Sequence, residues 1–262
     1  MGARFGPHPH PAAPDVSAPP TVIHMPDDSY WTLPPDRLVY GSMGHCNITV
    51  LLPPFDVDAR TLPANDPARA AELAASLDTV DEVLEEIGPR SVHDVPYPYT
   101  RTDLEIVQTA AWGHVLGICD PALADSGNDL PLLSQARRLR ERYPDARIVG
   151  RVRFHSGAAH TEDIVWLPDG ALFHAAGWPG DEPFEVTGDP SAIASALGIT
   201  DEALEDLGLD EEDPADVEWA DFAALALGEA DPWGIERIQT TAFRVRHTEF
   251  ATSTMEELYF TA

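Results

Sequence analysis

The chain has 262 residues and a mass of 28.5 kDa, and 44% of its residues are hydrophobic, which is enough for one large domain or two small ones. The chain has 16 basic residues, all of them arginine, and 45 acidic ones, so the formal net charge is −29 and the pI is about 4.4. This balance disfavours a nucleic-acid surface, and the absence of lysine excludes Schiff-base catalysis, pyridoxal phosphate anchoring and a phosphate-loop lysine.

Two cysteines, Cys46 and Cys119, have no second cysteine nearby and indicate buried reduced thiols rather than a disulfide framework or a metal knuckle. No apolar stretch is long enough for a membrane span, and no apolar core follows the N-terminus as in a signal peptide. We therefore predict a cytoplasmic protein that does not bind membranes. Residues 1–26 are rich in proline without apolar periodicity and are predicted to be a disordered tail, with Met25 as an alternative natural start.

The remaining residues, 27–262, are predicted to form a single globular domain. The predicted elements of its first half are strands at 38–40 and 46–52 around a turn at 41–44, helices at 66–77 and 79–88, and a strand or hairpin at 104–119 that turns near Gly113. Asp66-Pro67 is a helix-opening pair. The helix at 79–88 is predicted because Val80, Val83 and Ile87 recur at helical spacing.

The second half contains the clearest pattern of the sequence. Its predicted elements are a basic helix over 130–144 capped by Asp129, a three-stranded antiparallel meander over 146–178, three acidic helices within 189–228 and a long strand at 235–250. Together, these elements predict an α+β fold with a mostly antiparallel sheet and packed helices.

Two pairs of segments suggest an internal duplication with a pseudo-two-fold relation. Residues 75–88 match 195–208 at six of 14 positions, and residues 104–113 match 235–244 at four of ten, in the same order. The repeats would span 37–116 and 147–250. The alternative is that acidic amphipathic helices resemble each other by composition alone.

Charge is segregated along the chain. Residues 137–153 hold seven of the 16 arginines, whereas residues 154–236 hold no arginine and 21 acidic residues. One interpretation is a solvated acidic face that keeps the protein soluble, and the other is an acidic surface that binds a basic partner.

The meander contains the best candidate site, because strand alternation places arginines and a histidine on one face. A two-residue turn at Gly157-Ala158 would set His155 opposite His160 and set Arg153 opposite Glu162. The candidate anion-binding residues are therefore Arg151, Arg153, His155, His160 and Glu162. His174 would join them only through a three-residue turn at Asp169-Gly170.

A metal is the weaker alternative for this patch. His155, His160 and Glu162 would form a two-histidine, one-carboxylate set of the kind that zinc favours. However, nearby arginines repel a cation, and the spacing matches no metalloenzyme signature. His160-Thr161-Glu162 and His247-Thr248-Glu249 both read H-x-E, but no P-C-x-x-C follows, so the zinc-deaminase motif is incomplete. No cofactor is predicted.

Several segments carry a resemblance to known sequences. They are DDSYWTLPPDRLV, TLPANDPARA, GICDPALADSGNDLPLL, AHTEDIVWLPDGALFHAAGWPGDEPFE and MEELYF. With the arginine-only, alanine- and proline-rich composition, they resemble a family of uncharacterised proteins from high-GC actinobacteria over about residues 27–262. The resemblance implies no activity, cofactor or site residue.

Two functions stay open at this point. The first is an acidic binding protein, of the immunity or inhibitor kind, that recognises a basic partner protein. The second is a small hydrolase or transferase that acts on an anionic metabolite at the Arg/His/Glu patch. The first is favoured because the catalytic motifs that were tested, including G-x-S-x-G and H-E-x-x-H, are absent from the sequence. A closed pocket around His155, Arg151 and Glu162 would favour the second.

Overall fold

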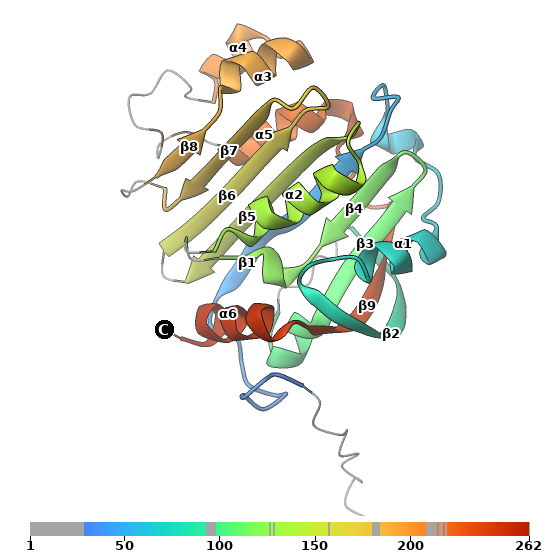
Figure 1. The fold of residues 1–262 in the computed structure, drawn as a ribbon, viewed down its shortest axis with the longest axis vertical. Coiled ribbons are helices and arrows are strands. Elements are labelled where there is room, and N and C mark those ends of the chain that lie inside the picture. The colour runs from blue at the N-terminus through green and yellow to red at the C-terminus, as the bar shows by residue number, and fades with distance from the viewer. Residues whose placement is uncertain are drawn as a thin grey trace, which may run out of the picture.

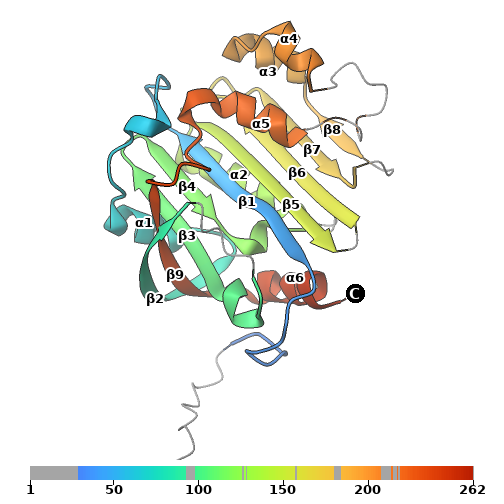
Figure 2. The same cartoon turned by 180° about the vertical axis from the view of Figure 1, so that it is seen from behind.

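The computed structural model describes residues 29–92, 98–125, 127, 129–156, 158–179, 184–207, 214, 217 and 219–261. The predicted tail, residues 1–26, lies outside these residues. One sheet of nine strands runs through the described part of the chain, with helices on both of its faces (Figure 1, Figure 2).

Neighbouring strands of the sheet are antiparallel throughout, in the order β2-β9-β3-β4-β1-β5-β6-β7-β8. The strands are β1 (Ser42–Leu51), β2 (Val80–Ser91), β3 (Ile106–Trp112), β4 (Val115–Cys119), β5 (Arg147–Ser156), β6 (Ala158–Trp166), β7 (Leu172–Gly177), β8 (Glu185–Thr187) and β9 (Gln239–His247). The predicted α+β class with a mostly antiparallel sheet is therefore confirmed.

The helices divide between the two faces of this sheet. They are α1 (Pro67–Ala74), α2 (Pro131–Arg142), α3 (Pro190–Leu197), α4 (Asp201–Glu205), α5 (Trp219–Leu227) and α6 (Glu249–Phe260), with short 3-10 turns η1 (Ala59–Thr61), η2 (Arg101–Glu105), η3 (Pro121–Leu123) and η5 (Gly228–Ala230). The first hydrophobic core packs α1, α2 and α6 against one face. The second core packs α5 and part of α3 against the other face.

Local signals in the sequence explain several element ends. Asp66 caps α1 by accepting the backbone N–H groups of Ala68 and Arg69, and Pro67 occupies the first helical position. Gly113 adopts a φ of 67° between β3 and β4, where the predicted hairpin turns. The predicted meander is also present as β5, β6 and β7.

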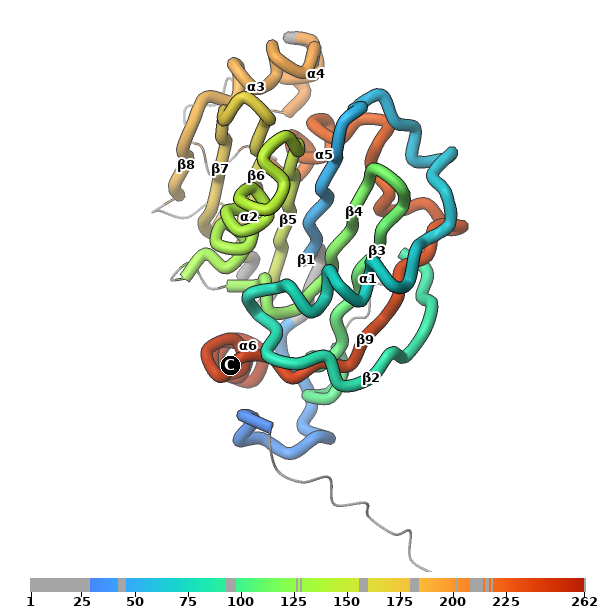
Figure 3. Tube along the Cα trace, turned by 45° about the vertical axis from the view of Figure 1, so that its right-hand side comes forward, coloured from blue at the N-terminus to red at the C-terminus, as the bar shows by residue number. Residues whose placement is uncertain are grey.

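The predicted helix at 79–88 is wrong, because these residues form most of β2 (Figure 3). The pairing of β2 with β9 shifts register three times, between Val80 and Glu82, between Val83 and Glu85, and between Glu86 and Gly88. Each shift inserts one extra residue into β2, so every third residue of β2 faces the same side. This spacing imitates the period of a helix, which explains the wrong prediction.

The proposed duplication has no support in the fold. Residues 80–88 are in a strand, whereas the matching residues 200–208 include all of α4. The second pair of matching segments, 104–113 and 235–244, includes β3 and the first part of β9. These two strands pair with each other in the same sheet and do not occupy equivalent positions of two repeats.

Two smaller predictions also need correction. The chain does not turn at 41–44, because β1 runs without interruption from Ser42 to Leu51, and Leu38 forms only an isolated bridge with Thr100. The predicted final strand ends at His247, and α6 follows after its capping residue Thr248.

Candidate functional site

The five candidate anion-binding residues lie on β5 and β6, but they do not share one face. The turn between these strands is one residue shorter than predicted, so Arg153 lies opposite Thr161 and His155 lies opposite Ala159. His160 and Glu162 instead lie opposite Phe154 and Val152. A one-residue change of register moves a whole strand's side chains to the other face, so the predicted pairings are wrong.

The face that packs toward α5 carries Arg151, Arg153 and His155. Arg151 is buried and forms an ion pair with Asp231, with 3.1 Å between Nη2 and Oδ2. Its cross-strand partner Asp163 is also buried, and burial raises the pKa of this carboxyl to about 8, although Arg151 and Arg153 lower it. His155 is exposed. Arg151 is thus already engaged by a carboxylate of the protein itself.

The opposite face carries Glu162 beneath the start of α2. Its Oε1 accepts the Leu133 backbone N–H at 3.0 Å and lies 3.0 Å from His174 Nε2. The carboxyl is completely buried, and this burial raises its pKa, although the hydrogen bond with His174 lowers it. Glu162 therefore connects β6, β7 and the first turn of α2.

His160 lies next to this pair and is also completely buried. Its ring packs edge-on against Trp178, with 5.3 Å between the ring centroids. A side chain at Gly127 would come within 3.3 Å of His160 Nε2, so the loop before α2 lies directly over the ring. Burial lowers the pKa of His160, and the nearby Asp125 carboxylate raises it.

Asp125 shapes the loop that leads into α2. Its Oδ2 accepts the backbone N–H groups of Asp129 and Leu130, each at 3.0 Å. These bonds hold Leu130 at a φ of 48°, which residues other than glycine rarely adopt. Leu130 is the capping position of α2 and makes no side-chain cap, so the predicted cap by Asp129 is wrong. Glu162 Oε1 accepts the Leu133 N–H and so binds one of the backbone N–H groups that a capping side chain would otherwise bind.

The alternative metal set is not assembled either. His155 points to the opposite face of the sheet from His160 and Glu162. Within the residues that the structure describes, no group of three histidine, cysteine or acidic side chains is placed to hold a metal ion. His174 was predicted to join only through a three-residue turn at Asp169-Gly170, and the structure has this register, with Trp166 opposite Leu172 and the Leu167 N–H bonded to the Ala171 carbonyl oxygen. His174 therefore lies on the same face as Glu162 and within 3.0 Å of it.

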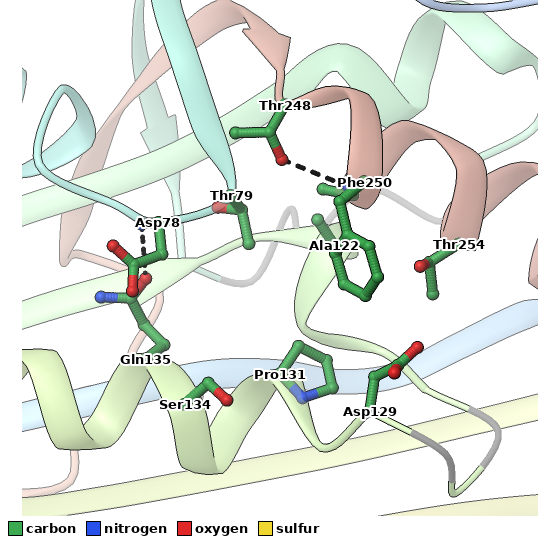
Figure 4. Close-up of a pocket in the computed structure, with 11 residues that line it drawn as sticks. Asp78, Thr79, Ala122, Asp129, Pro131, Ser134, Gln135, Thr248, Phe250 and Thr254 are labelled. Atoms are coloured by element: carbon green, nitrogen blue, oxygen red, sulfur yellow. Dashed lines mark hydrogen bonds between the residues drawn. The ribbon is translucent and has the colours of Figure 1, made fainter.

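A small cleft of about 130 Å³ lies between α2 and α6 (Figure 4). Its polar lining is already bonded within the protein, because Gln135 Oε1 accepts the Asp78 N–H and Asp78 pairs with Arg138. Phe250 covers one side and is 64% exposed. Sites for small organic ligands usually measure about 300–1,000 Å³. This cleft is thus too small for a metabolite.

The second charged feature is the acidic end, which we define as the exposed carboxylates of β8, α4 and α5, of the residue before α3 and of the residue after α4. They are Glu185, Asp189, Glu202, Glu205, Asp206 and Asp221. These elements lie at the same end of the molecule in both ribbon views. No ion pair joins any of the six to another described residue, and Asp189 caps α3.

The arginines of 137–153 do not neutralise the acidic end. Arg138 pairs with Asp78, and Arg140 donates to the Pro168 carbonyl oxygen at 2.6 Å. Arg147 donates to the Ala226 carbonyl oxygen, and Arg151 pairs with Asp231. None of these four arginines pairs with one of the six carboxylates of the acidic end, although Arg151 pairs with Asp231 of the acidic stretch 154–236.

Sequence analysis missed several of these contacts. The bond between Glu162 and the start of α2 depends on a distant strand, and no local signal announces it. Leu130-Pro131 signals only that the helix begins at Pro131, since a residue before proline disfavours the right-handed helical conformation, and the positive φ of Leu130 has no local signal.

The fold and the site define an α+β protein built on a nine-stranded antiparallel sheet, with a buried acid–histidine pair and an acidic end that has no ion-pair partner among the described residues. None of the described helices is both long and apolar enough to cross a membrane. Residues 30–262 match the family described as "Family of unknown function (DUF6333)", and the chain belongs to this family. No curated protein and no solved structure matches the chain.

Proposed function

We propose that this protein is a cytoplasmic binding protein of the immunity or inhibitor kind, which recognises a basic partner protein through the acidic end. The observation that carries the proposal is the set of exposed carboxylates on β8, α4 and α5 and at the residues next to α3 and α4, for which the described residues provide no ion-pair partner. The free thiols of Cys46 and Cys119 support a reducing compartment, and the arginine-only composition supports an actinobacterial source.

Clustered charge of one sign favours this function for a physical reason. Like charges at one end repel each other and lower the stability of the folded protein, whereas a basic partner surface removes that repulsion and steers association. A charge placed only for solubility would be effective anywhere on the surface. The concentration of carboxylates at one end, without ion-pair partners among the described residues, therefore supports recognition.

The enzyme alternative loses its main support. It required Arg151, His155 and Glu162 around one pocket, but these residues lie on two faces of the sheet. Neither the cleft between α2 and α6 nor the larger cavity considered below is lined by any of the three.

The test compares two variants that lose the same charge. The first combines Glu202→Gln, Glu205→Gln and Asp206→Asn within the acidic end. The matched control combines three exposed residues of α1, α2 and the turn after α2, as Glu72→Gln, Glu141→Gln and Asp145→Asn. Binding to cytochrome c, a basic folded protein, is measured by calorimetry in about 20 mM and about 150 mM salt.

We expect the acidic-end variant to bind about tenfold more weakly at low salt and the control to bind nearly as well as the wild type. Equal losses in the two variants would show that only the net charge matters, and the proposed recognition surface would then be wrong.

A further inference from the structure

A larger cavity of about 600 Å³ lies at the other end of the sheet, between residues 29–35, η2 and the strands β2 and β9. This volume is within the usual range for a small organic ligand. Tyr30, Trp31 and Leu84 supply apolar walls, and Arg101, Glu105 and Arg244 supply a charged one. Arg246 and Glu82 also line the cavity and pair with each other at 2.7 Å, so they balance each other's charge.

The charged wall holds two guanidinium groups around one carboxylate. Arg101 Nη1 lies 2.7 Å from Glu105 Oε1, and Arg244 Nη1 lies 3.1 Å from Glu105 Oε2. The side chains of Arg101 and Glu105 are only 7% and 14% exposed. The other carboxylate near Arg244, that of Glu85, lies 3.7 Å away and is 64% exposed, so solvent weakens its effect. The sheltered part of the wall therefore has an excess of positive charge.

Arg101 also has an unused donor. Its Nε is buried and has no hydrogen-bond partner among the residues that the structure describes. The guanidinium lies over the Trp31 ring, with 5.2 Å from Cζ to the ring centroid. A buried donor normally finds an acceptor, so Glu105 alone does not satisfy the Arg101 guanidinium, and an anion in the cavity would supply the missing negative charge.

From this geometry, we infer that the cavity is a binding site for a small organic anion, a carboxylate or sulfonate attached to an aromatic body. The anionic group binds Arg101, and the aromatic body packs between Trp31, Tyr30 and Leu84. The inference is independent of the proposed function, because no residue of the acidic end lines this cavity.

The test uses two probes with the same rings. The first is 1-anilinonaphthalene-8-sulfonate, and the second is N-phenyl-1-naphthylamine, which lacks the sulfonate. Fluorescence titration of the full chain should show one saturable site for the sulfonate and at least tenfold weaker binding of the neutral amine. Equal affinities would overturn the inference, and so would failure of both probes to bind.

Two variants then locate the site. Arg101→Gln should remove the preference for the sulfonate, and Leu84→Trp should block both probes by filling the cavity. Leu84 is 47% exposed, so the larger side chain leaves the core unchanged, and this variant decides the outcome even if Arg101→Gln fails to fold. The control is Phe250→Ala in the cleft between α2 and α6, which should bind as the wild type does. Sulfonate binding that survives Leu84→Trp would place the probe elsewhere and overturn the inference.

Discussion

Glu162 and Asp163 are neighbours in β6, yet their carboxyl groups meet opposite faces of the sheet and different surroundings. Glu162 lies on the face that packs against α2 and uses one oxygen to bind both Leu133 and His174. Asp163 lies on the face that packs against α5, and neither of its oxygens has a hydrogen-bond partner among the described residues. Both side chains are buried.

The comparison shows that burial alone does not assign a role to a carboxyl group. The hydrogen bonds of Glu162 connect a helix to two strands, so its removal leaves donors without acceptors. Asp163 makes no such bonds, and burial favours its protonated form. Substitution of the two residues should therefore change stability in opposite directions at alkaline pH.

The largest effect is expected for Glu162→Ala. This change leaves the Leu133 N–H and the His174 ring buried without their acceptor, which should lower the free energy of unfolding by about 3–5 kcal/mol. Urea denaturation monitored by circular dichroism measures the loss. Glu162→Gln keeps a side-chain oxygen for Leu133 and should lose about half as much. A loss below about 1 kcal/mol for Glu162→Ala would contradict the connecting role.

The second effect has the opposite sign and depends on pH. In the folded protein, Asp163 keeps its proton up to about pH 8, whereas the unfolded chain releases it near pH 3.8. Between these values the folded state binds more protons, so stability falls as pH rises, and this contribution is lost by about pH 8. Asp163→Asn removes the dependence and should be more stable than the wild type at pH 9 by a few kcal/mol, since each pH unit of the shift contributes about 1.4 kcal/mol.

The same denaturation series at pH 5 and pH 9 checks this prediction. The difference between the variant and the wild type should be several kcal/mol smaller at pH 5 than at pH 9, because pH 5 is only slightly above the pH at which the unfolded chain releases the Asp163 proton. A variant that is less stable than the wild type at pH 9 would show that the ionised carboxylate pairs with Arg151 and is needed.

These two residues also show what the sequence could predict. Apolar alternation and turn residues predicted β5, β6 and β7, because these signals act within a few residues of chain. The register of β5 and β6 depends on whether one residue or two form the turn, and the sequence Ser156-Gly157-Ala158 permits both. A change of one residue was enough to separate Arg151 from Glu162.

The error in β2 has a related cause. Its apolar residues Val80, Val83 and Ile87 have helical spacing, but the partner strand decides the conformation. Glu82 pairs with Arg246 and Glu85 pairs with Arg244 across the strands, and both arginines lie more than 150 residues away in the chain. Local propensity cannot report such contacts.

The smallest of the three effects concerns Arg151 on the face that packs against α5, and it separates a structural role from an anion site. Arg151→Ala removes the ion pair with Asp231, whose side chain is 21% exposed, and should lower stability by about 1–3 kcal/mol. If the pair is structural, the loss is the same with and without inorganic phosphate.

If Arg151 belongs to the predicted anion site, phosphate should stabilise the wild type by about 2.7 kcal/mol at a hundredfold excess over its dissociation constant and should not stabilise Arg151→Ala. Arg60→Ala, a change at a side chain that is 66% exposed, is the control and should respond to phosphate as the wild type does. We expect equal phosphate responses in all three proteins, because Asp231 already occupies the Arg151 guanidinium and the histidines of the predicted patch are divided between two faces. A phosphate gain that disappears only in Arg151→Ala would restore the anion site on this face.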